Sequence, residues 1–133
     1  MSGPITGGCA CGAVRYESAG VIEFSFHCYC RKCQRATGAG HASAFALPVT
    51  DVKMTGKVAY HEQQADTGHA TWSGFCPECG SPLISKTAQC PDRLYFHAAT
   101  LDDPSTFEPT FLVFEDRAQP WDPVVPRLQR PSV

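Results

Sequence analysis

Seven of the eight cysteines in this 133-residue chain fall into three short clusters, and this grouping is the strongest constraint that the sequence places on the fold. Two clusters hold two cysteines each and the middle cluster holds three, while the eighth, Cys90, stands apart. The clustered residues are Cys9, Cys11, Cys28, Cys30, Cys33, Cys76 and Cys79. Because four sulfurs complete a tetrahedral zinc site, seven sulfurs predict one closed zinc site and a second site with a free position.

A disulfide framework is the alternative explanation for so many cysteines, and the length of the chain argues against it. Disulfide scaffolds are usually short secreted chains that cannot build an adequate core, whereas 133 residues can bury roughly two thirds of their unfolded surface. Residues 1–8 also lack the basic start and apolar run of a secretory signal, and no segment has the length of a membrane span. We therefore expect a cytoplasmic protein without membrane contact, in which clustered cysteines bind metal.

The charge of the chain makes nucleic acid an unexpected partner. The formal net charge is -2, and the sequence contains no basic stripe long enough to follow a phosphate backbone. Only Arg31, Lys32 and Arg35 concentrate positive charge, and they surround the last cysteine of the middle cluster. We expect them to offset the net charge of about −1 of a three-thiolate zinc centre, and secondarily to form a docking patch for an anionic ligand.

Alternation of apolar and polar residues predicts a mainly β fold. Ile22, Phe24 and Phe26 alternate with polar neighbours, and the same face would continue in phase to Cys28 and Cys30. Further strands are predicted at residues 14–17, 42–47, 57–60, 70–75, 94–98 and 110–114, and a short helix at residues 31–36.

The turns between these segments are too short to be interdomain linkers. We therefore expect a single domain over residues 1–133, with its core at about residues 5–118. Residues 119–133 form a proline-rich tail that cannot continue a central strand. Within this tail we expect Trp121 and Val125 to anchor the chain to the body of the domain.

The local spacing of the outer cysteines suits metal binding. On a strand, Cys9 and Cys11 would project to the same face with Cα atoms about 6.6 Å apart, so that their sulfurs can converge on one ion. Cys76 and Cys79 have the spacing of a zinc knuckle, in which a turn brings two thiolates to one ion. Gly80, directly after this pair, is expected to supply the unusual backbone dihedral of the turn.

Spacing leaves two ways to combine the clusters. In the first, the two outer pairs share one ion and the middle triplet binds another. In the second, Cys30 and Cys33 join Cys76 and Cys79 in a ribbon-like site, and the first pair is spare. Charge and count favour the first arrangement, because every clustered cysteine then binds metal and no exposed reactive dithiol remains.

The residues around the cysteines also carry a family resemblance. Residues 7–16, 27–38 and 75–83 each combine a cysteine cluster with flanking glycines, and residues 100–104 and 120–121 add further matches. Together they resemble the glutathione-dependent formaldehyde-activating enzyme family, also called the centromere protein V and formaldehyde-activating domain. The resemblance spans nearly the whole chain and implies a mainly β, single-domain Mss4-like β-tent fold with two zinc ions.

The resemblance also implies roles for the cysteines and a reaction. The structural zinc would be held by Cys9, Cys11, Cys76 and Cys79. The catalytic zinc would be held by Cys28, Cys30 and Cys33. The family activity joins formaldehyde to glutathione as S-hydroxymethylglutathione and is classed as a carbon–sulfur lyase for the reverse direction, so the implied partners are a small-molecule thiol, such as glutathione, and a small carbonyl.

The chemistry of an open zinc site is compatible with this reaction. Such a site can hold a thiol as thiolate or polarise a carbonyl, and three thiolates make zinc electron-rich, so we favour thiol binding. A non-catalytic thiol carrier and a structural zinc domain for protein contacts are the alternatives. One departure concerns Leu112, which lies where family members often carry a histidine before an aliphatic residue and a phenylalanine.

The remaining candidate residues have ordinary structural explanations. We expect His27 and His97 to be strand residues without a direct role. His41, which follows a glycine-rich loop, is expected to lie outside the open site. Cys90 is expected to be a plain loop or core thiol.

Overall fold

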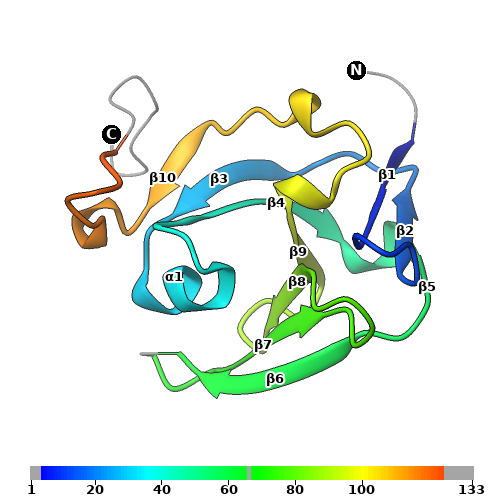
Figure 1. Cartoon of the computed structure of the whole chain (residues 1–133), viewed down its shortest axis with the longest axis horizontal. Helices are drawn as coiled ribbons and strands as arrows, with labels where there is room; N and C mark the ends of the chain where they lie inside the picture. The colour runs from blue at the N-terminus through cyan, green and yellow to red at the C-terminus, as the bar shows by residue number, and fades with distance from the viewer. Residues whose placement is uncertain (1–3, 66, 125–133) are drawn as a thin grey trace.

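The structure, a computed structural model, describes residues 4–65 and 67–124, and it is built mainly of β-strands (Figure 1), as the sequence predicts. The strands form a three-stranded sheet with the order β1-β2-β5 and a seven-stranded sheet with the order β10-β3-β4-β9-β8-β7-β6. The smaller sheet comprises β1 (Ile5–Gly8), β2 (Arg15–Ser18) and β5 (Val52–Thr55). The larger sheet comprises β3 (Phe24–Cys28), β4 (Ala42–Pro48), β6 (Ala59–Gln64), β7 (Ala70–Phe75), β8 (Pro82–Thr87), β9 (Arg93–His97) and β10 (Phe111–Val113).

The larger sheet curves around the single α-helix of the described chain, α1 (Arg31–Thr37), which lies on its concave side between β4 and β6 (Figure 1). All neighbouring strands of this sheet run antiparallel except β10, which pairs with β3 in parallel. The short 3-10 helices are η1 (Val49–Asp51), η2 (Ala98–Thr100), η3 (Pro104–Thr106) and η4 (Glu115–Arg117). A cavity lined by residues of α1, β3, β4, β7, β8 and β9 lies on this side of the sheet.

The hydrophobic core lies between the two sheets. Tyr16 of β2 stacks on Phe96 of β9 with ring centroids 4.1 Å apart, and Phe45 of β4 stacks on the same ring at 5.9 Å. Phe45 and Leu47 are fully buried in this core. Because side chains alternate along a strand, the intervening β4 residues, which are alanines, face the concave side. Strand β4 therefore separates a core of large side chains from a surface of small ones.

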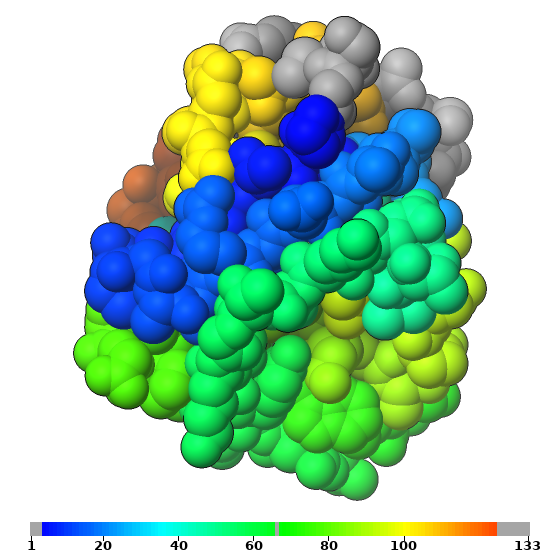
Figure 2. Space-filling model, turned by 90° about the vertical axis from the view of Figure 1, so that its right-hand side faces the viewer, coloured from blue at the N-terminus to red at the C-terminus, as the bar shows by residue number. Residues whose placement is uncertain are grey.

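The smaller sheet contacts the segment that follows β9 of the larger sheet. Arg15 of β2 makes a two-pronged ion pair with Asp102, with distances of 2.9 and 2.5 Å. Gly7 forms an isolated bridge with Leu101, which places β1 beside the segment that follows β9. In Figure 2 the strands of the smaller sheet, in blue and teal, cover one face of the molecule above the green hairpin of β6 and β7.

Several boundaries differ from the sequence-based expectation. The predicted strand face does not continue to Cys30, because β3 ends at Cys28 and Cys30 caps the N-terminus of α1. The phenylalanines Phe24 and Phe26 are only half-buried, since they face the concave side, while Ser25 is buried on the opposite face. The strand expected at residues 57–60 begins later, as β6, and β5 and β8 were not predicted. Cys9 and Cys11 are not on a strand as expected, because β1 ends at Gly8 and Cys11 lies in the turn that follows it.

The anchor that joins the tail to the domain is also different from the one expected. Trp121 is 69% exposed and does not anchor the chain. Instead, Asp122 lies 2.6 Å from Nδ1 of His41, the residue directly before β4. Residues 125–133, the rest of the expected tail and the location of the second expected anchor, Val125, lie outside the described residues. None of the described helices is long and apolar enough to cross a membrane.

Candidate functional site

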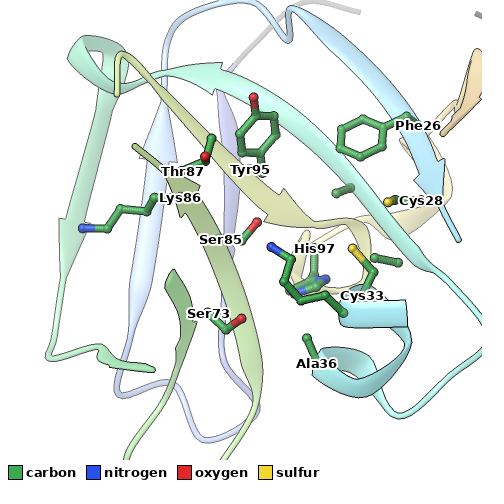
Figure 3. A pocket seen from close by; sticks show the side chains of 13 residues that line it. Phe26, Cys28, Cys33, Ala36, Ser73, Ser85, Lys86, Thr87, Tyr95 and His97 are labelled. Carbon is green, nitrogen blue, oxygen red and sulfur yellow. The ribbon is translucent and has the colours of Figure 1, made fainter. Parts of the chain in front are cut away.

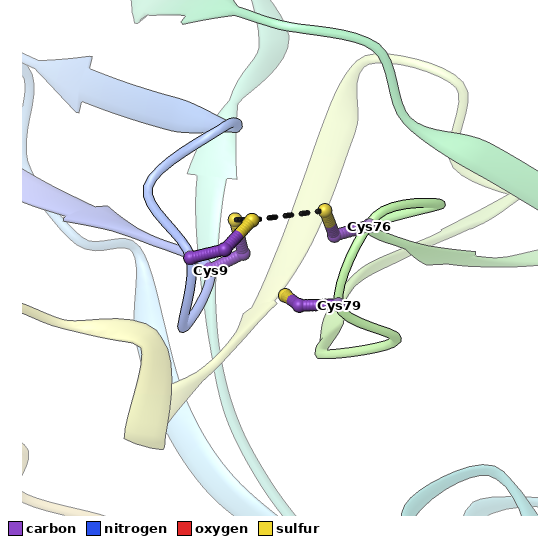
Figure 4. Close-up of side chains that lie close together, drawn as sticks. Cys9, Cys76 and Cys79 are labelled. Carbon is purple, nitrogen blue, oxygen red and sulfur yellow. Dashed lines mark hydrogen bonds between the residues drawn. The ribbon is translucent and has the colours of Figure 1, made fainter.

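The outer cysteine pairs meet in one cluster, although they are far apart in sequence. The Sγ atoms of this group all lie within 4.8 Å of one another. Sγ of Cys11 is 3.6 Å from that of Cys9 and 3.8 Å from that of Cys76, and Cys79 completes the group (Figure 4). Four sulfurs about 2.3 Å from one tetrahedral ion lie about 3.8 Å apart, so the observed spacing fits a metal site. We call this group the outer cluster.

Backbone N–H groups support the sulfurs of the outer cluster. The N–H of Val14 donates to Sγ of Cys9 at 3.3 Å, and this bond is the main cause of the lowered pKa of that thiol. Hydrogen bonding from Ser81 lowers the pKa of Cys79 to about 5. Thiolate, not thiol, is the metal-binding form of cysteine, so these bonds prepare the cluster for a cation.

The turn after Cys79 behaves as the sequence predicts. Gly80 has a φ of +80°, in the left-handed region that side chains rarely adopt, and its N–H donates to the carbonyl of Cys76 at 2.8 Å. A Cβ at this position would meet no atom within 4 Å. The glycine is therefore required by backbone conformation and not by lack of space.

The three middle cysteines converge at the junction of β3 and α1. Cys28 is the buried last residue of β3, Cys30 is the N-cap of α1, and Cys33 lies in the first turn of the helix. Their Sγ atoms lie within 4.8 Å of one another, and the N–H of Cys33 donates to Sγ of Cys30 at 3.3 Å. The helix N-terminus favours negative charge, so it stabilises thiolates here. We call this group the inner cluster.

The inner thiols cannot all ionise without a balancing cation. Hydrogen bonds from Cys28 and then Cys33 lower the pKa of Cys30 to about 2. The same contacts raise the pKa of Cys28 to about 11, chiefly because of Cys30, and raise the pKa of Cys33, chiefly because of Cys28. One negative charge is therefore shared among three sulfurs, and a bound cation would allow all three to act as thiolate ligands.

Two cavities open beside the inner cluster, and both are lined by Cys28, Lys32 and Cys33. The first, of about 160 Å³, lies in the curve of the larger sheet (Figure 3). This cavity, called the apolar cavity here, has Phe26, Ala36, Ala42, Ala44 and Tyr95 in its lining. The polar residues Ser73, Ser85, Lys86, Thr87 and His97 complete its lining.

The second cavity, of about 340 Å³, carries positive charge and is called the cationic cavity here. Arg31, Lys32 and Arg117 line it, and its described lining contains no acidic side chain. Glutamines from β6 and the loop after β8 supply neutral polar groups. Phe114, another lining residue, has a φ of +56°, an uncommon conformation for a residue with a large side chain. Such a surface suits an anionic, polar ligand.

The structure distinguishes the two arrangements that spacing left open. It brings the two outer pairs together and gathers the middle triplet separately, whereas Cys30 and Cys33 do not group with Cys76 and Cys79. Metal binding by either cluster stays a prediction. Of the three basic residues predicted to serve the middle cluster, Arg31 and Lys32 line the cationic cavity, while Arg35 is exposed near the helix C-terminus and lines neither cavity.

The other candidate residues fall into two groups. His27 and His41 lie outside both cavities: His27 bonds to the Ser43 hydroxyl at 2.8 Å, and the two histidine rings meet edge-on at 4.6 Å. Cys90 likewise lies away from both clusters, with Sγ 3.9 Å from the Arg93 guanidinium. His97, expected to be an ordinary strand residue, lines the apolar cavity, and burial lowers its pKa.

The cavity linings are the part of the site that sequence reasoning missed. One signal was present: in β4 the alanines Ala42, Ala44 and Ala46 alternate with larger residues. A strand with one small-residue face marks a place where something else must fill space. Residues from β7, β8 and β9 that complete the cavity are distant in sequence, and no local pattern associates them with the cysteines.

Comparisons with known proteins agree with the cysteine motifs. The family model described as "Glutathione-dependent formaldehyde-activating enzyme" matches residues 4–117. A protein of Halomonas elongata, provisionally named as a glutathione-dependent formaldehyde-activating enzyme, is 28% identical over 120 residues, which cover 85% of this chain and 76% of that protein. A crystal structure of a Rhodobacter sphaeroides protein matches with a TM-score of 0.53 and 26% identity, over 73% of this chain and 87% of that one.

Proposed function

The chain belongs to the glutathione-dependent formaldehyde-activating enzyme family, and we propose that it is a zinc-dependent enzyme that joins a thiol to a carbonyl compound. In the reverse direction the same chemistry is that of a carbon–sulfur lyase, as in the splitting of S-hydroxymethylglutathione. The observation that carries this proposal is the position of the inner cluster, three cysteines at the junction of two cavities of different character.

Both clusters fit zinc by the chemistry of their donors. Four cysteine ligands are typical of structural zinc sites, and three protein ligands leave the fourth position of a catalytic zinc site open. We assign a structural zinc to the outer cluster and a catalytic zinc to the inner cluster of Cys28, Cys30 and Cys33. When bound there, zinc supplies a fourth position at which a thiol is held as thiolate near neutral pH.

The cationic cavity is the proposed binding site of the thiol substrate. Glutathione carries two carboxylates, and the basic residues Arg31, Lys32 and Arg117 line this cavity. Arg31 is positioned by a 3.1 Å bond from its guanidinium to Oε1 of Gln34, a side chain that is itself buried. Charge recognition in this cavity would orient the thiol toward the inner cluster.

The apolar cavity is the proposed binding site of the carbonyl compound. It shares Cys28 and Cys33 with the cationic cavity, so a carbonyl bound here faces a thiol bound there. The carbon–sulfur bond forms as the thiol proton passes to the carbonyl oxygen. His97 lines this cavity, and because burial lowers its pKa, its imidazole is neutral at pH 7 and can hold that proton at a ring nitrogen.

The proposal is tested by the rate of carbonyl loss with zinc-loaded protein, glutathione and formaldehyde, corrected for the uncatalysed reaction. We expect many turnovers per chain, and their loss in Cys33→Ser. Cys90→Ser is the matched control, because this thiol lies outside both clusters. A burst of one equivalent without turnover would contradict an enzyme and favour a thiol carrier.

A further inference from the structure

The carbonyl substrate can be defined more closely from the shape of the apolar cavity. We propose that it is an aldehyde carrying an aromatic ring, with the ring seated in the apolar cavity and the aldehyde carbon at the inner cluster. This inference rests on the proposed function, because it names the carbonyl that the same site would accept. Its basis is the floor, the walls, the volume and the far end of the cavity.

The floor of the cavity is a flat surface of small side chains. Ala42 and Ala44 of β4 line it, and Ala44 lies between Phe26 of β3 and His97 of β9 in the sheet register. The larger β4 side chains, Phe45 among them, are buried on the opposite face. Because the alanine side chains are small, they leave the space above them unfilled, and a planar group can lie against them.

Aromatic rings form the walls. Phe26 and Tyr95 meet almost at right angles, with an interplanar angle of 82° and ring centroids 6.1 Å apart. Phe111 stacks on Phe26 at 5.7 Å, and Phe24 contacts Tyr95 at 6.3 Å, so the walls are themselves packed. Edge-to-face and offset-stacked contacts favour an aromatic ring over an aliphatic chain of equal size.

The volume matches one ring. The cavity measures about 160 Å³, and an apolar protein cavity of about 150 Å³ is sufficient to bind benzene. Formaldehyde has two non-hydrogen atoms and occupies a space comparable to one or two waters of about 30 Å³ each. It would leave most of this cavity to solvent against apolar walls, which is unfavourable.

The end of the cavity away from the sulfurs is polar. Ser73 and Ser85 are directly opposite each other in the register of β7 and β8, and Figure 3 shows them and Thr87 on the other side of the cavity from Cys28 and Cys33. These hydroxyls can hydrogen-bond a polar substituent on the ring, opposite to the aldehyde.

Lys86, the lysine at this end, places no charge in the cavity. Nζ of Lys86 lies 4.3 Å from the centroid of the Tyr60 ring, and in Figure 3 this side chain extends away from the sulfurs. A neutral hydroxyl therefore fits this end of the cavity, and 4-hydroxybenzaldehyde is a suitable probe.

The reaction with such an aldehyde needs no additional reactant. The sulfur of the thiol forms a bond to the aldehyde carbon, the carbonyl π bond breaks, and the thiol proton passes to the oxygen, which gives a hydroxyl. Nothing is oxidised or reduced. The step is the same as for formaldehyde, with hydrogen replaced by the ring on the carbonyl carbon.

The experiment compares kcat/KM for 4-hydroxybenzaldehyde and formaldehyde with glutathione and the zinc-loaded protein. We expect kcat/KM for 4-hydroxybenzaldehyde to be roughly ten times kcat/KM for formaldehyde. This ratio should fall at least tenfold in Ala44→Leu and in Ala36→Leu, because each leucine fills part of the cavity. Ala36→Leu guards against misfolding of the strand variant, because leucine is a strong helix former. Ala59→Leu, in β6 and outside the cavity, is the matched control and should keep the ratio unchanged. A ratio below one, or the same ratio in the filled variants, would overturn the inference.

A binding measurement separates failure of this inference from failure of the proposed function. The probe is 4-hydroxybenzyl alcohol, which has the ring but no reactive carbonyl, and saturation-transfer NMR detects its binding. If no aldehyde turns over, the proposed function is wrong. Binding of the probe that weakens about tenfold in Ala36→Leu would still support the cavity as a ring site, whereas absence of binding to the unmodified protein would overturn it.

Discussion

Sγ of Cys11 lies 3.8 Å from Sγ of Cys76, although the two residues are 65 positions apart in the chain. Cys11 follows β1 of the smaller sheet, and Cys76 directly follows β7 of the larger one. The outer cluster therefore closes a long loop and joins the two sheets. An ion at this point restricts the unfolded chain as a crosslink does and contributes its binding energy to folding.

Replacement of Cys76 by serine should release one metal ion and destabilise the protein. Cys76 is fully buried, and loss of a metal is among the few single changes that cost on the order of 4 kcal/mol or more. Metal analysis and denaturant unfolding measure the two effects. Cys90→Ser should keep the metal content and change the free energy of unfolding by less than about 1 kcal/mol. Equal stability of the two variants would show that the outer cluster does not hold the fold together.

Gly80→Ala should destabilise the protein through the backbone alone. The residue has a φ of +80° and open space around the position of a Cβ, so the added methyl group meets nothing. The left-handed conformation costs a residue with a side chain about 1–2 kcal/mol. We expect a loss of that size in the free energy of unfolding with both metals retained. An unchanged stability would mean that the turn can adopt another conformation.

The buried hydroxyl of Tyr16 should make stability sensitive to high pH. It donates to Oγ1 of Thr100 at 2.7 Å, since that hydroxyl itself donates to the carbonyl of His97. Burial raises the pKa of Tyr16 from 10.0 to about 12 in the folded protein. The neutral form is therefore favoured by folding, and its contribution is complete below pH 10 and is lost as the pH rises from 10 through 12.

The variant Tyr16→Phe tests this expectation. At neutral pH it should cost about 1 kcal/mol for the lost hydrogen bond. Between pH 10 and 12 its stability should fall less steeply than that of the unmodified protein, as measured by urea unfolding across this range. Parallel pH profiles for the two proteins would count against a neutral buried hydroxyl.

Arg31→Ala should weaken recognition of a charged thiol. Loss of one charge-assisted contact to a carboxylate should raise KM for glutathione by roughly tenfold, while KM for its dimethyl ester should stay nearly constant. The fold should tolerate the change, because Oε1 of the buried Gln34 keeps a 3.1 Å bond from Gln119. Lys53→Ala, exposed on β5, is the control for general charge effects. Equal changes for acid and ester would place the thiol elsewhere.

The two cysteine groups follow from count, charge and the family resemblance, because spacing leaves two arrangements open. The mainly β fold is predicted because strands depend on local patterns of alternation. The β9 alternation of Leu94 and Phe96 is one such pattern, and both residues are buried as expected. The strand at residues 70–75 is likewise confirmed. In these segments the alternation of apolar and polar neighbours is sufficient to predict which side chains are buried.

Other features depend on contacts between distant segments and could not be predicted. β1, with two glycines, has little strand character of its own and is fixed by pairing with β2 and by the bridge from Gly7 to Leu101. Cys30 leaves the strand because the helix begins one residue later and needs a cap. The cavity walls combine Phe26 with Tyr95, whose proximity depends on the sheet order β3-β4-β9.

The zinc content of Cys33→Ser tests the central claim most directly, because this change removes one ligand of the inner cluster and none of the outer cluster. We predict two zinc ions per chain in the unmodified protein, purified in parallel, and one zinc ion per chain in Cys33→Ser, with the fold retained. Two zinc ions per chain in Cys33→Ser, or unfolding of this variant at the same denaturant concentration as Cys76→Ser, would contradict two separate zinc sites with different roles.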